Sequence, residues 1–497
     1  MSTDQRVPDG AALVVIGATG DLANRKLFPA IASLAHRGQL PSNFSLVGVA
    51  RTEFGDAEFT DSVFASIRAV DPAAEAAFRA LMPRIRYVAG MFDEAATWNT
   101  LRAVLDGCDA EHGACGNRLM YLSTLPQFFE AAINGLSEAG LARDPEGGYT
   151  RVIIEKPFGT DLESGRELNT FIHQHLDERQ IFRIDHYLGK ETVQNVLALR
   201  FANAIFEPIW DRRYVDHVQI TVAESIGVEH RGTFYEQAGT LRDIVQNHAL
   251  QVLSLVAMEP PASFGADEVR DEKVKVLKSI EHMNTFDVGL GVVRGQYTSG
   301  EVGGETVNGY LDEEGVSPTS TTETFIAMRL AIDNWRWAGV PFYLRAGKRL
   351  GKRVTEVALR FKSVPHLALP TTAIDSMEPN TLVLRIQPDE GVRLEFGAKV
   401  PGSGFEVRTV GLDFSFREGF TEVAPEAYER LLLDALVGDA TLFIREDEVD
   451  VAWQIVQPML DAINSGSVPV HPYKAGTWGP YASDELLDAH FDHWRTL

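Results

Sequence analysis

Residues 12–23 read Ala-Leu-Val-Val-Ile-Gly-Ala-Thr-Gly-Asp-Leu-Ala, and they indicate how the N-terminal part of the chain folds. The first five are all apolar, as in a strand that is buried on both faces. Glycines follow, and apolar residues then recur at helical spacing, at Leu27, Ala30 or Ile31, and Leu34. A strand, a glycine turn and a helix in this order predict the first unit of a dinucleotide-binding fold.

The glycine turn is a candidate phosphate-binding loop, although its spacing is Gly-x-x-Gly-x-x-Ala rather than Gly-x-Gly-x-x-Gly. Thr19 stands where the usual fingerprint has its second glycine. An ordinary strand-to-helix connection explains the turn almost as well, and its position at the first strand–helix junction is what favours a cofactor. The candidate cofactor-binding residues of the turn are Gly17, Ala18, Thr19, Gly20, Asp21 and Leu22.

An arginine, Arg51, follows the second predicted strand, Ser45–Ala50. NAD-preferring sites usually place Asp or Glu there to bind a ribose hydroxyl, whereas an arginine accommodates a 2′-phosphate. Arg51 therefore favours NADP over NAD. An exposed loop arginine is an equally good reading until the fold is accepted.

Strands and helices alternate further along, which predicts a Rossmann-like, doubly wound parallel sheet. Helices are expected at Ala95–Leu105 and Phe128–Ala139, and strands at Tyr87–Ala89, Leu119–Ser123, Arg151–Glu155 and Ile181–Ile184. Pro157 biases Lys156 toward an extended backbone, and the bond between them is a candidate for the cis form. Lys156, at the end of a strand, is a candidate contact to both cofactor and substrate.

Residues 183–191 read Arg-Ile-Asp-His-Tyr-Leu-Gly-Lys-Glu and concentrate reactive side chains before a predicted helix, Thr192–Phe201. His186, the hydroxyl of Tyr187 and Lys190 suit a phosphoryl dianion, and Gly189 is expected to turn the backbone sharply. Asp185 would repel a phosphate, so we expect it to orient a histidine from elsewhere in the chain. A charged surface loop is the alternative, and the tight mixture of groups favours function over it.

The second half begins with a strand in which Val218, Ile220 and Val222 alternate as in a half-buried strand, ending near Glu224. A long helix is predicted over Thr240–Met258. Its polar stripe consists of Thr240, Asp243, Asn247 and Gln251, and His248 lies at the border of the apolar face. A lone helix histidine is more often a core residue than a catalyst. The neighbouring polar stripe favours a catalytic role here.

The remaining chain predicts a large, mostly antiparallel sheet flanked by helices at Pro425–Leu436 and Asp447–Ile463. Its expected strands are Thr324–Ile332, Val340–Arg345, Thr355–Phe361, Asn380–Gln387, Val392–Phe396 and Phe405–Val410. Five cations lie in nine positions from Arg345 to Arg353, which suggests an anion site or a solvated strand end. We therefore expect an α/β domain at residues 1–185 and an α+β domain at residues 186–497.

Composition excludes several classes of protein. The net charge of −24 argues against nucleic-acid and anionic-membrane partners, and no apolar run is long enough for a membrane span. The N-terminus lacks an apolar signal core, and the two cysteines, Cys108 and Cys115, match no metal or redox motif. We expect a cytoplasmic protein without a metal site.

Residues 185–191, Asp-His-Tyr-Leu-Gly-Lys-Glu, resemble the signature of the glucose-6-phosphate dehydrogenase family, and the likeness extends along nearly the whole chain. The resemblance implies oxidation of D-glucose 6-phosphate at C1 to 6-phospho-D-glucono-1,5-lactone, with hydride transfer to NADP+, at the entry to the pentose phosphate pathway. It also implies a homodimer or homotetramer.

The resemblance assigns roles to the candidate residues. His248 is the expected general base and Asp185 its partner, while Arg51, with Thr52, contacts the 2′-phosphate of NADP. The expected substrate-binding residues are Lys156, His186, Tyr187, Lys190, Glu224, Asp243, Lys348 and Arg353. Of the last two, Lys348 is the stronger assignment because it lies in the matching Leu-Arg-x-Gly-Lys context.

Some relatives hold a second, structural NADP through added lysines. Val354 and Glu395 occupy the positions expected for those lysines here, which argues against the extra site. Two other functions are compatible with parts of the sequence. A Rossmann oxidoreductase of an unphosphorylated sugar is disfavoured by His186 and Lys190, and a non-catalytic nucleotide sensor is disfavoured by the presence of both His248 and Asp185.

Overall fold

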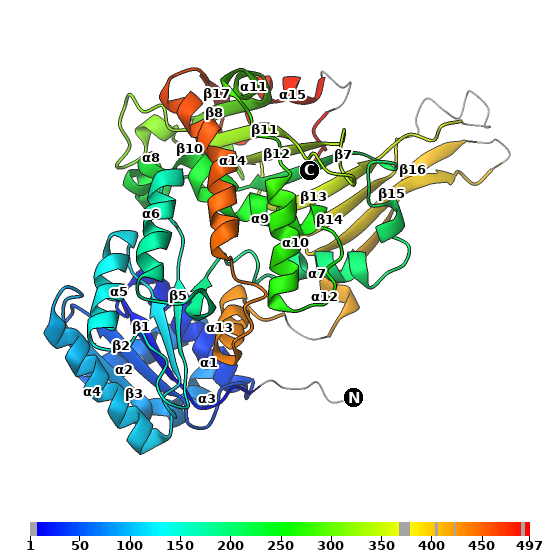
Figure 1. Ribbon diagram of the computed structural model, residues 1–497. Helices are drawn as coiled ribbons and strands as arrows, with labels where there is room; N and C mark the ends of the chain where they lie inside the picture. The colour runs from blue at the N-terminus through cyan, green and yellow to red at the C-terminus, as the bar shows by residue number, and fades with distance from the viewer. Residues whose placement is uncertain (1–6, 367–377, 403–405, 422–423, 489–492) are drawn as a thin grey trace. The chain divides into compact units, whose positions relative to one another are not determined.

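The computed structural model describes residues 7–366, 378–402, 406–421, 424–488 and 493–497, and the chain divides into two compact units (Figure 1). The first unit comprises Met1–Lys190, Ala262–Arg270 and Ala424–Asp450. The second comprises Glu191–Pro261, Asp271–Val423 and Val451–Leu497. Two segments from late in the chain therefore belong to the same unit as the N-terminus.

The first unit is built on a six-stranded parallel sheet in the order β3-β2-β1-β4-β5-β6. This order, with a reversal beside β1, is that of a doubly wound dinucleotide-binding fold and confirms the predicted fold class. The strands are β1 (Ala12–Ile16), β2 (Ser45–Ala50), β3 (Ile85–Ala89), β4 (Arg118–Leu122), β5 (Thr150–Ile154) and β6 (Ile181–Arg183).

Helices connect these strands, and the segment from late in the chain adds one more. Helix α13 packs against α1 and the π-helix before it. Lys26 Nζ of the π-helix lies 2.9 Å from Oε1 of Glu426, the residue before α13, and Arg37 Nε lies 3.3 Å from Glu429 Oε2. The helices are the π-helix Ala23–Leu27, α1 (Phe28–His36), α2 (Asp56–Val70), α3 (Pro72–Phe78), α4 (Ala95–His112), α5 (Phe129–Glu138), α6 (Leu162–His173) and α13 (Ala427–Val437).

The second unit is built on a nine-stranded sheet in the order β16-β15-β14-β13-β7-β12-β11-β8-β17. Among the described residues of this sheet, the β7–β12 and β8–β17 pairs are parallel and the other six pairs are antiparallel, which confirms the predicted, mostly antiparallel sheet. The strands are β7 (Val215–Ala223), β8 (Val292–Thr298), β11 (Phe325–Ala331), β12 (Pro341–Gly347), β13 (Val354–Phe361), β14 (Thr381–Gln387), β15 (Gly391–Lys399), β16 (Val407–Ser415) and β17 (Val470–Lys474). Phe405, the first residue of one predicted strand, lies outside the described residues.

A short hairpin, β9 (Gly300–Val302) and β10 (Glu305–Val307), and several helices complete the elements of this part of the chain. Helices α10 and α14 include the boundaries between the units at Arg270 and Asp450. The helices are α7 (Glu191–Phe201), α8 (Gly232–Thr240), the π-helix Leu241–Ala249, α9 (Leu250–Ala257), α10 (Ala266–Lys278), α11 (Thr285–Gly291), α12 (Phe416–Gly419), α14 (Glu446–Asn464) and α15 (Glu485–Asp488). No helix of the described residues is long and apolar enough to cross a membrane.

Strand β7 differs from its prediction, because every residue except Asp216 is buried rather than alternate ones. Its polar residues are held inside by hydrogen bonds, since Gln219 Nε2 donates to the His493 carbonyl at 2.9 Å and Thr221 Oγ1 accepts from Arg345 Nε at 3.1 Å. Buried polar groups are tolerated when they are paired in this way. The polar residues that alternate with Val218, Ile220 and Val222 therefore point to polar partners inside the protein and not to solvent.

Candidate active site

The glycine turn after β1 has the close backbone approach expected of a phosphate-binding loop. Gly17 adopts φ +94°, and a Cβ there would lie 2.2 Å from the Ser123 carbonyl oxygen, so only glycine fits. The hydroxyls of Thr19 and Thr52 lie 3.4 Å apart. The first two strand ends thus bring two of the predicted cofactor residues together.

The other predicted cofactor residues differ in how available their side chains are. Arg51, directly after β2, is exposed, and no hydrogen bond or ion pair of its guanidinium is found in the described part of the chain. Asp21 forms an exposed ion pair with Arg25 at 2.8 Å, which stabilises the following helix rather than a ligand. Ala18 is buried, so only its backbone is available for a cofactor.

The segment after β6 brings three predicted substrate residues into contact. Lys190 Nζ lies 3.8 Å from the centre of the Tyr187 ring, and the Tyr187 and His186 rings are 5.3 Å apart at 62°. Asp185 is buried, and its Oδ1 accepts the Tyr187 backbone N–H at 2.9 Å. This compact turn presents an imidazole, a phenol and an ammonium together, the mixture that suits a phosphoryl group.

Gly189 has a different role from the one expected. It does not adopt a left-handed backbone, so a sharp turn is not what requires glycine. A Cβ at this position would lie 2.6 Å from the Ala427 carbonyl oxygen and 3.0 Å from Leu431. Glycine therefore allows the turn to approach helix α13 closely, a contact between distant parts of the sequence that local patterns do not reveal.

Lys156 follows β5, the neighbour of β6, and the Lys156–Pro157 bond is cis, as predicted. The two strands end level, because the Ile184 N–H donates to the Ile154 carbonyl at 2.9 Å. Lys156 and Asp185 each follow these ends, and both act electrostatically on Glu155. The structure thus brings Lys156 to the same edge of the parallel sheet as the 185–190 turn.

In the second unit, Glu224 and Lys348 form an ion pair for a simple topological reason. Strands β7 and β12 are parallel neighbours, with Ala223 opposite Gly347, so the residue after each strand emerges at the same place. Lys348 Nζ lies 2.5 Å from Glu224 Oε2, and the lysine is buried. Both residues were predicted to bind the substrate, but their pairing was not predicted.

Tyr235 is a further residue of this cluster that sequence reasoning missed. Its ring lies 5.1 Å from Lys348 Nζ, and burial raises the pKa of its phenol, as do the nearby charges of Asp243, Glu323 and Glu224. Glu224, Asp243 and Lys348 therefore surround one buried tyrosine. Tyr235 lies in a glycine-punctuated segment without hydrophobic periodicity, so no sequence signal marked it.

His248 lies in the π-helix Leu241–Ala249, whereas an α-helix was predicted. The histidine is buried, and its backbone N–H donates to Asn247 Oδ1 at 2.6 Å. Thr240 bonds to Tyr235 and Asn247 to the Arg242 carbonyl, so two members of the expected polar stripe serve the local backbone and core. π-helical turns are frequent at functional sites.

The predicted basic run, Arg345 to Arg353, does not act as one group. Arg345 is buried, and its guanidinium lies 4.6 Å from the Trp494 ring. Arg353 is exposed and donates to Gln387 Oε1 at 3.2 Å. Among the described residues, Lys348 is the cation of this run that pairs with Glu224. Nearby, Glu395 accepts hydrogen bonds from Arg393 and Arg495.

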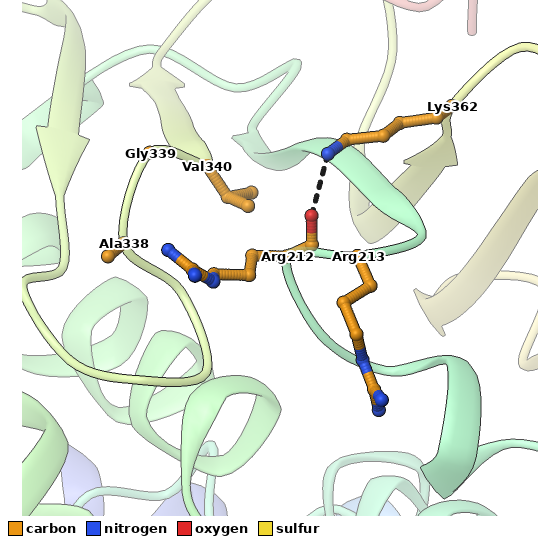
Figure 2. A pocket seen from close by; sticks show the side chains of 6 residues that line it. All are labelled: Arg212, Arg213, Ala338, Gly339, Val340 and Lys362. Carbon is orange, nitrogen blue, oxygen red and sulfur yellow. Dashed lines mark hydrogen bonds between the residues drawn. The ribbon is translucent and has the colours of Figure 1, made fainter.

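Two other features carry no role in this site. A cavity of about 330 Å³ in the second unit is lined by Arg212, Arg213, Ala338, Gly339, Val340 and Lys362 (Figure 2). Lys362 donates to the Arg212 carbonyl at 2.7 Å, and Arg213 forms an ion pair with Asp211. In the first unit, His173 lies 3.0 Å from Glu178, but Arg183 already neutralises that carboxylate at 2.7 Å, so we assign no metal.

The strand order and the glycine turn at the first strand–helix junction define a dinucleotide-binding fold. Comparison with protein families agrees. The model "Glucose-6-phosphate dehydrogenase, NAD binding domain" matches residues 14–195, and "Glucose-6-phosphate dehydrogenase, C-terminal domain" matches residues 197–495. The chain belongs to the glucose-6-phosphate dehydrogenase family.

Curated relatives and solved structures are similar over almost the whole chain. Glucose-6-phosphate 1-dehydrogenase 2 of Mycobacterium tuberculosis is 48% identical, covering 99% of this chain and 96% of its own. The enzyme of Aggregatibacter actinomycetemcomitans is 46% identical, covering 98% and 97%. A glucose-6-phosphate dehydrogenase in complex with glucose 6-phosphate has a TM-score of 0.90 at 35% identity, covering 100% of both chains. The enzyme from Mycobacterium avium has 0.83 at 40%, covering 98% and 99%.

These comparisons confirm the predicted family and enzyme class. The protein is an oxidoreductase that oxidises glucose 6-phosphate and uses a nicotinamide dinucleotide. The comparisons do not assign roles to individual residues, so the predicted site remains a set of proposals.

Proposed function

We propose that the protein oxidises D-glucose 6-phosphate at C1 to 6-phospho-D-glucono-1,5-lactone and that NADP+ accepts the hydride. The observation that carries the substrate assignment is the contact cluster of His186, Tyr187 and Lys190 after β6. In open α/β sheets, ligands bind beyond the carboxyl ends of the strands. In a chain of net charge −24, such a local cationic group is what can hold a sugar phosphate.

NADP+ is the proposed cofactor because Arg51 follows β2 with an exposed guanidinium and no acidic residue takes its place there. A fixed positive charge at this point suits a 2′-phosphate, while NAD offers it only hydroxyls. Thr52 assists, and the turn from Gly17 to Leu22 binds the pyrophosphate. Bound NADP+ supplies the hydride-accepting chemistry, and the protein's residues align the substrate.

The sugar ring is proposed to bind near Glu224, Asp243 and Lys348. The 2.5 Å ion pair of Glu224 and Lys348 supports grouping Lys348 with the residues that bind the sugar hydroxyls. Lys156 bridges the sugar and the cofactor. Arg353 is the least supported of the proposed substrate-binding residues, because its guanidinium donates a hydrogen bond to Gln387.

His248 is proposed as the general base that removes the proton of the C1 hydroxyl as the hydride leaves. Histidine suits this task because the residue type titrates near neutral pH. Asp185 is its proposed partner: a carboxylate hydrogen-bonded to the imidazole stabilises the imidazolium that forms. Both side chains are buried, as expected of groups that exchange a proton away from bulk water.

One assay separates this function from its rivals. Formation of NADPH from NADP+, or of NADH from NAD+, is measured with glucose 6-phosphate and with glucose. The proposal requires turnover that depends on the phosphate and is faster with NADP+. Equal rates with glucose would instead favour a dehydrogenase of unphosphorylated sugars. Nucleotide binding without turnover on either sugar would favour a sensor.

The protein is proposed to form a homodimer or homotetramer through its large sheet. Strand β16 is an edge strand exposed along most of its length, and Val410, Leu412 and Phe414 occupy alternate positions on it, so they lie on one face of the sheet. An exposed apolar row on a sheet edge marks a site of association. Light scattering should give a mass of two or four chains, and Leu412→Glu should reduce it to one or two.

A further inference from the structure

Three side chains from distant parts of the sequence meet behind the strand ends of the first unit. They are Tyr121 on β4, Glu155 directly after β5, and Tyr428 in the first turn of α13. The Tyr121 hydroxyl donates to Glu155 Oε1 at 2.5 Å, and Tyr428 hydrogen-bonds to the same carboxylate. We call Tyr121, Glu155 and Tyr428 the tyrosine–carboxylate cluster. The sequence analysis assigned none of the three a function.

The cluster touches the proposed phosphate site through Tyr428. The Tyr428 ring stacks on the His186 imidazole, with centres 6.3 Å apart and planes at 11°. The parallel rings place Tyr428 beside the His186 imidazole, and a hydrogen bond to Glu155 holds the phenol at the other end of the Tyr428 side chain. A carboxylate that also bonds to a second tyrosine thus holds the ring that lies beside His186.

The charges around the cluster are well defined. Burial of the Glu155 carboxylate raises its pKa to about 7, while the two phenols and Lys156 lower it and Asp185 raises it. Burial also raises the pKa of Tyr121 and of Tyr428, where Glu155 adds to the shift. Both phenols are therefore protonated donors at neutral pH.

We infer that Tyr428, held by Glu155 and Tyr121, is a positioning residue that orients His186 for the phosphate of the substrate. The inference rests on the proposed function, because it requires His186 to bind that phosphate. A residue that orients a binding group affects substrate affinity more than the chemical step. Its loss should therefore appear in KM and in phosphate binding, not in kcat.

Two substitutions separate the stack from the hydrogen bond. Tyr428→Phe keeps the ring and loses the hydroxyl, and should raise KM for glucose 6-phosphate about 2- to 5-fold. Tyr428→Leu loses the stack as well, and should raise KM at least about 10-fold. In both variants kcat should stay within about 2-fold, and the inhibition constant of inorganic phosphate should rise with KM.

Tyr149→Phe is the matched control. The Tyr149 hydroxyl also donates to α13, to the Leu436 carbonyl at 3.1 Å, but at the opposite end of that helix. This variant should lower the melting temperature about as much as Tyr428→Phe and leave KM unchanged. A change in KM that follows the melting temperature in all variants would mean that the cluster is merely structural.

A pH profile supplies a second, independent readout. Tyr121→Phe removes a donor that lowers the pKa of Glu155, so any pH midpoint of KM that depends on Glu155 should move upward. The titratable groups facing the cluster are Lys156, Asp185, His186 and Glu426. An unchanged midpoint together with unchanged KM in Tyr428→Leu would overturn the inference. If instead the wild-type protein does not turn over glucose 6-phosphate, the proposed function fails.

Discussion

The ammonium nitrogen of Lys348 lies 2.5 Å from Oε2 of Glu224, at the ends of two parallel strands in the middle of a mostly antiparallel sheet. The Lys348 side chain is 6% exposed and that of Glu224 30%, so the pair is shielded on one side and reachable on the other. The carboxylate and the ammonium group of such a pair can each also form a hydrogen bond to a sugar hydroxyl. Substituting either residue therefore tests whether the second unit contributes to substrate binding.

Removing one member of this pair should cost both stability and affinity. Lys348→Met leaves the Glu224 carboxylate without its cation, and should lower the free energy of unfolding by about 2 kcal/mol. It should also raise KM for glucose 6-phosphate at least about 10-fold. Glu224→Gln combined with Lys348→Met should recover part of the stability in urea denaturation. A double variant as unstable as the sum of the single ones would show that the pair is not coupled.

Replacement of the proposed base should affect turnover and not binding. His248→Asn is expected to lower kcat by about 10² to 10⁴, because that is the usual contribution of a general base. KM for glucose 6-phosphate should change by less than about 3-fold. Steady-state kinetics checks both values. Retained turnover in this variant would exclude His248 as the base.

Lys190 should act in the opposite way. Lys190→Ala removes a charge-assisted hydrogen bond to the phosphate, worth about 1.5–3 kcal/mol, so KM should rise about 10- to 100-fold while kcat changes little. Lys362→Ala is a matched control, because that lysine lies in the cavity of Figure 2 and donates to a backbone carbonyl. An equal effect of both substitutions would point to general electrostatics rather than a phosphate site.

Arg51 should decide between the two nicotinamide cofactors. Arg51→Ala removes the proposed partner of the 2′-phosphate and should raise KM for NADP+ about 10- to 100-fold. KM for NAD+ should stay within about 2-fold, because NAD lacks that phosphate. The ratio of kcat/KM for the two cofactors measures the preference. A ratio that Arg51→Ala leaves unaltered would place the 2′-phosphate elsewhere.

Glu155 should make stability depend on pH in a direction opposite to that of most carboxylates. Its pKa in the folded protein is about 7, above the ordinary 4.5, so the folded state holds an extra proton between these values. Its contribution to stability is therefore present below about pH 4.5 and is lost as the pH rises through about 7. The melting temperature of the wild type minus that of Glu155→Gln should fall between pH 5 and pH 8.

Glu75→Gln provides the control for that measurement. Hydrogen bonding to Arg68 holds the pKa of Glu75 at about 2, so this carboxylate stays ionised over the whole range from pH 5 to pH 8. The corresponding difference in melting temperature should be constant. A constant difference for Glu155→Gln as well would show that its carboxylate titrates outside this window.

Local sequence predicted the bounds of strands correctly where every residue of the strand is buried. Strands β1 and β2 begin and end as predicted, because a short apolar run between turn residues leaves little choice. The π-helix Leu241–Ala249 was mistaken for an α-helix, since apolar spacing alone does not distinguish the two over nine residues. The cytoplasmic location predicted from composition remains a prediction.

Residue types in the site were predictable, but their partners were not. The turn from Asp185 to Lys190 was predictable because it concentrates charged and hydrogen-bonding side chains in a few positions. Lys348 and Glu224 are 124 positions apart and meet only because β7 and β12 are neighbours. Tyr428 is farther still from His186, and its place depends on α13 joining the first unit. Strand order and long-range packing carry this information, and no local pattern contains it.

The division of the chain also bears on how the protein is made. The first unit is not complete until Asp450 has been translated, and the second needs residues up to Leu497. A nascent chain that has reached Lys190 possesses all six parallel strands but lacks α13, whose Glu426 pairs with Lys26 across 400 positions. Helix α1 then exposes to solvent or to a chaperone the surface that α13 later covers. Neither half of the gene, expressed alone, should yield a native fragment.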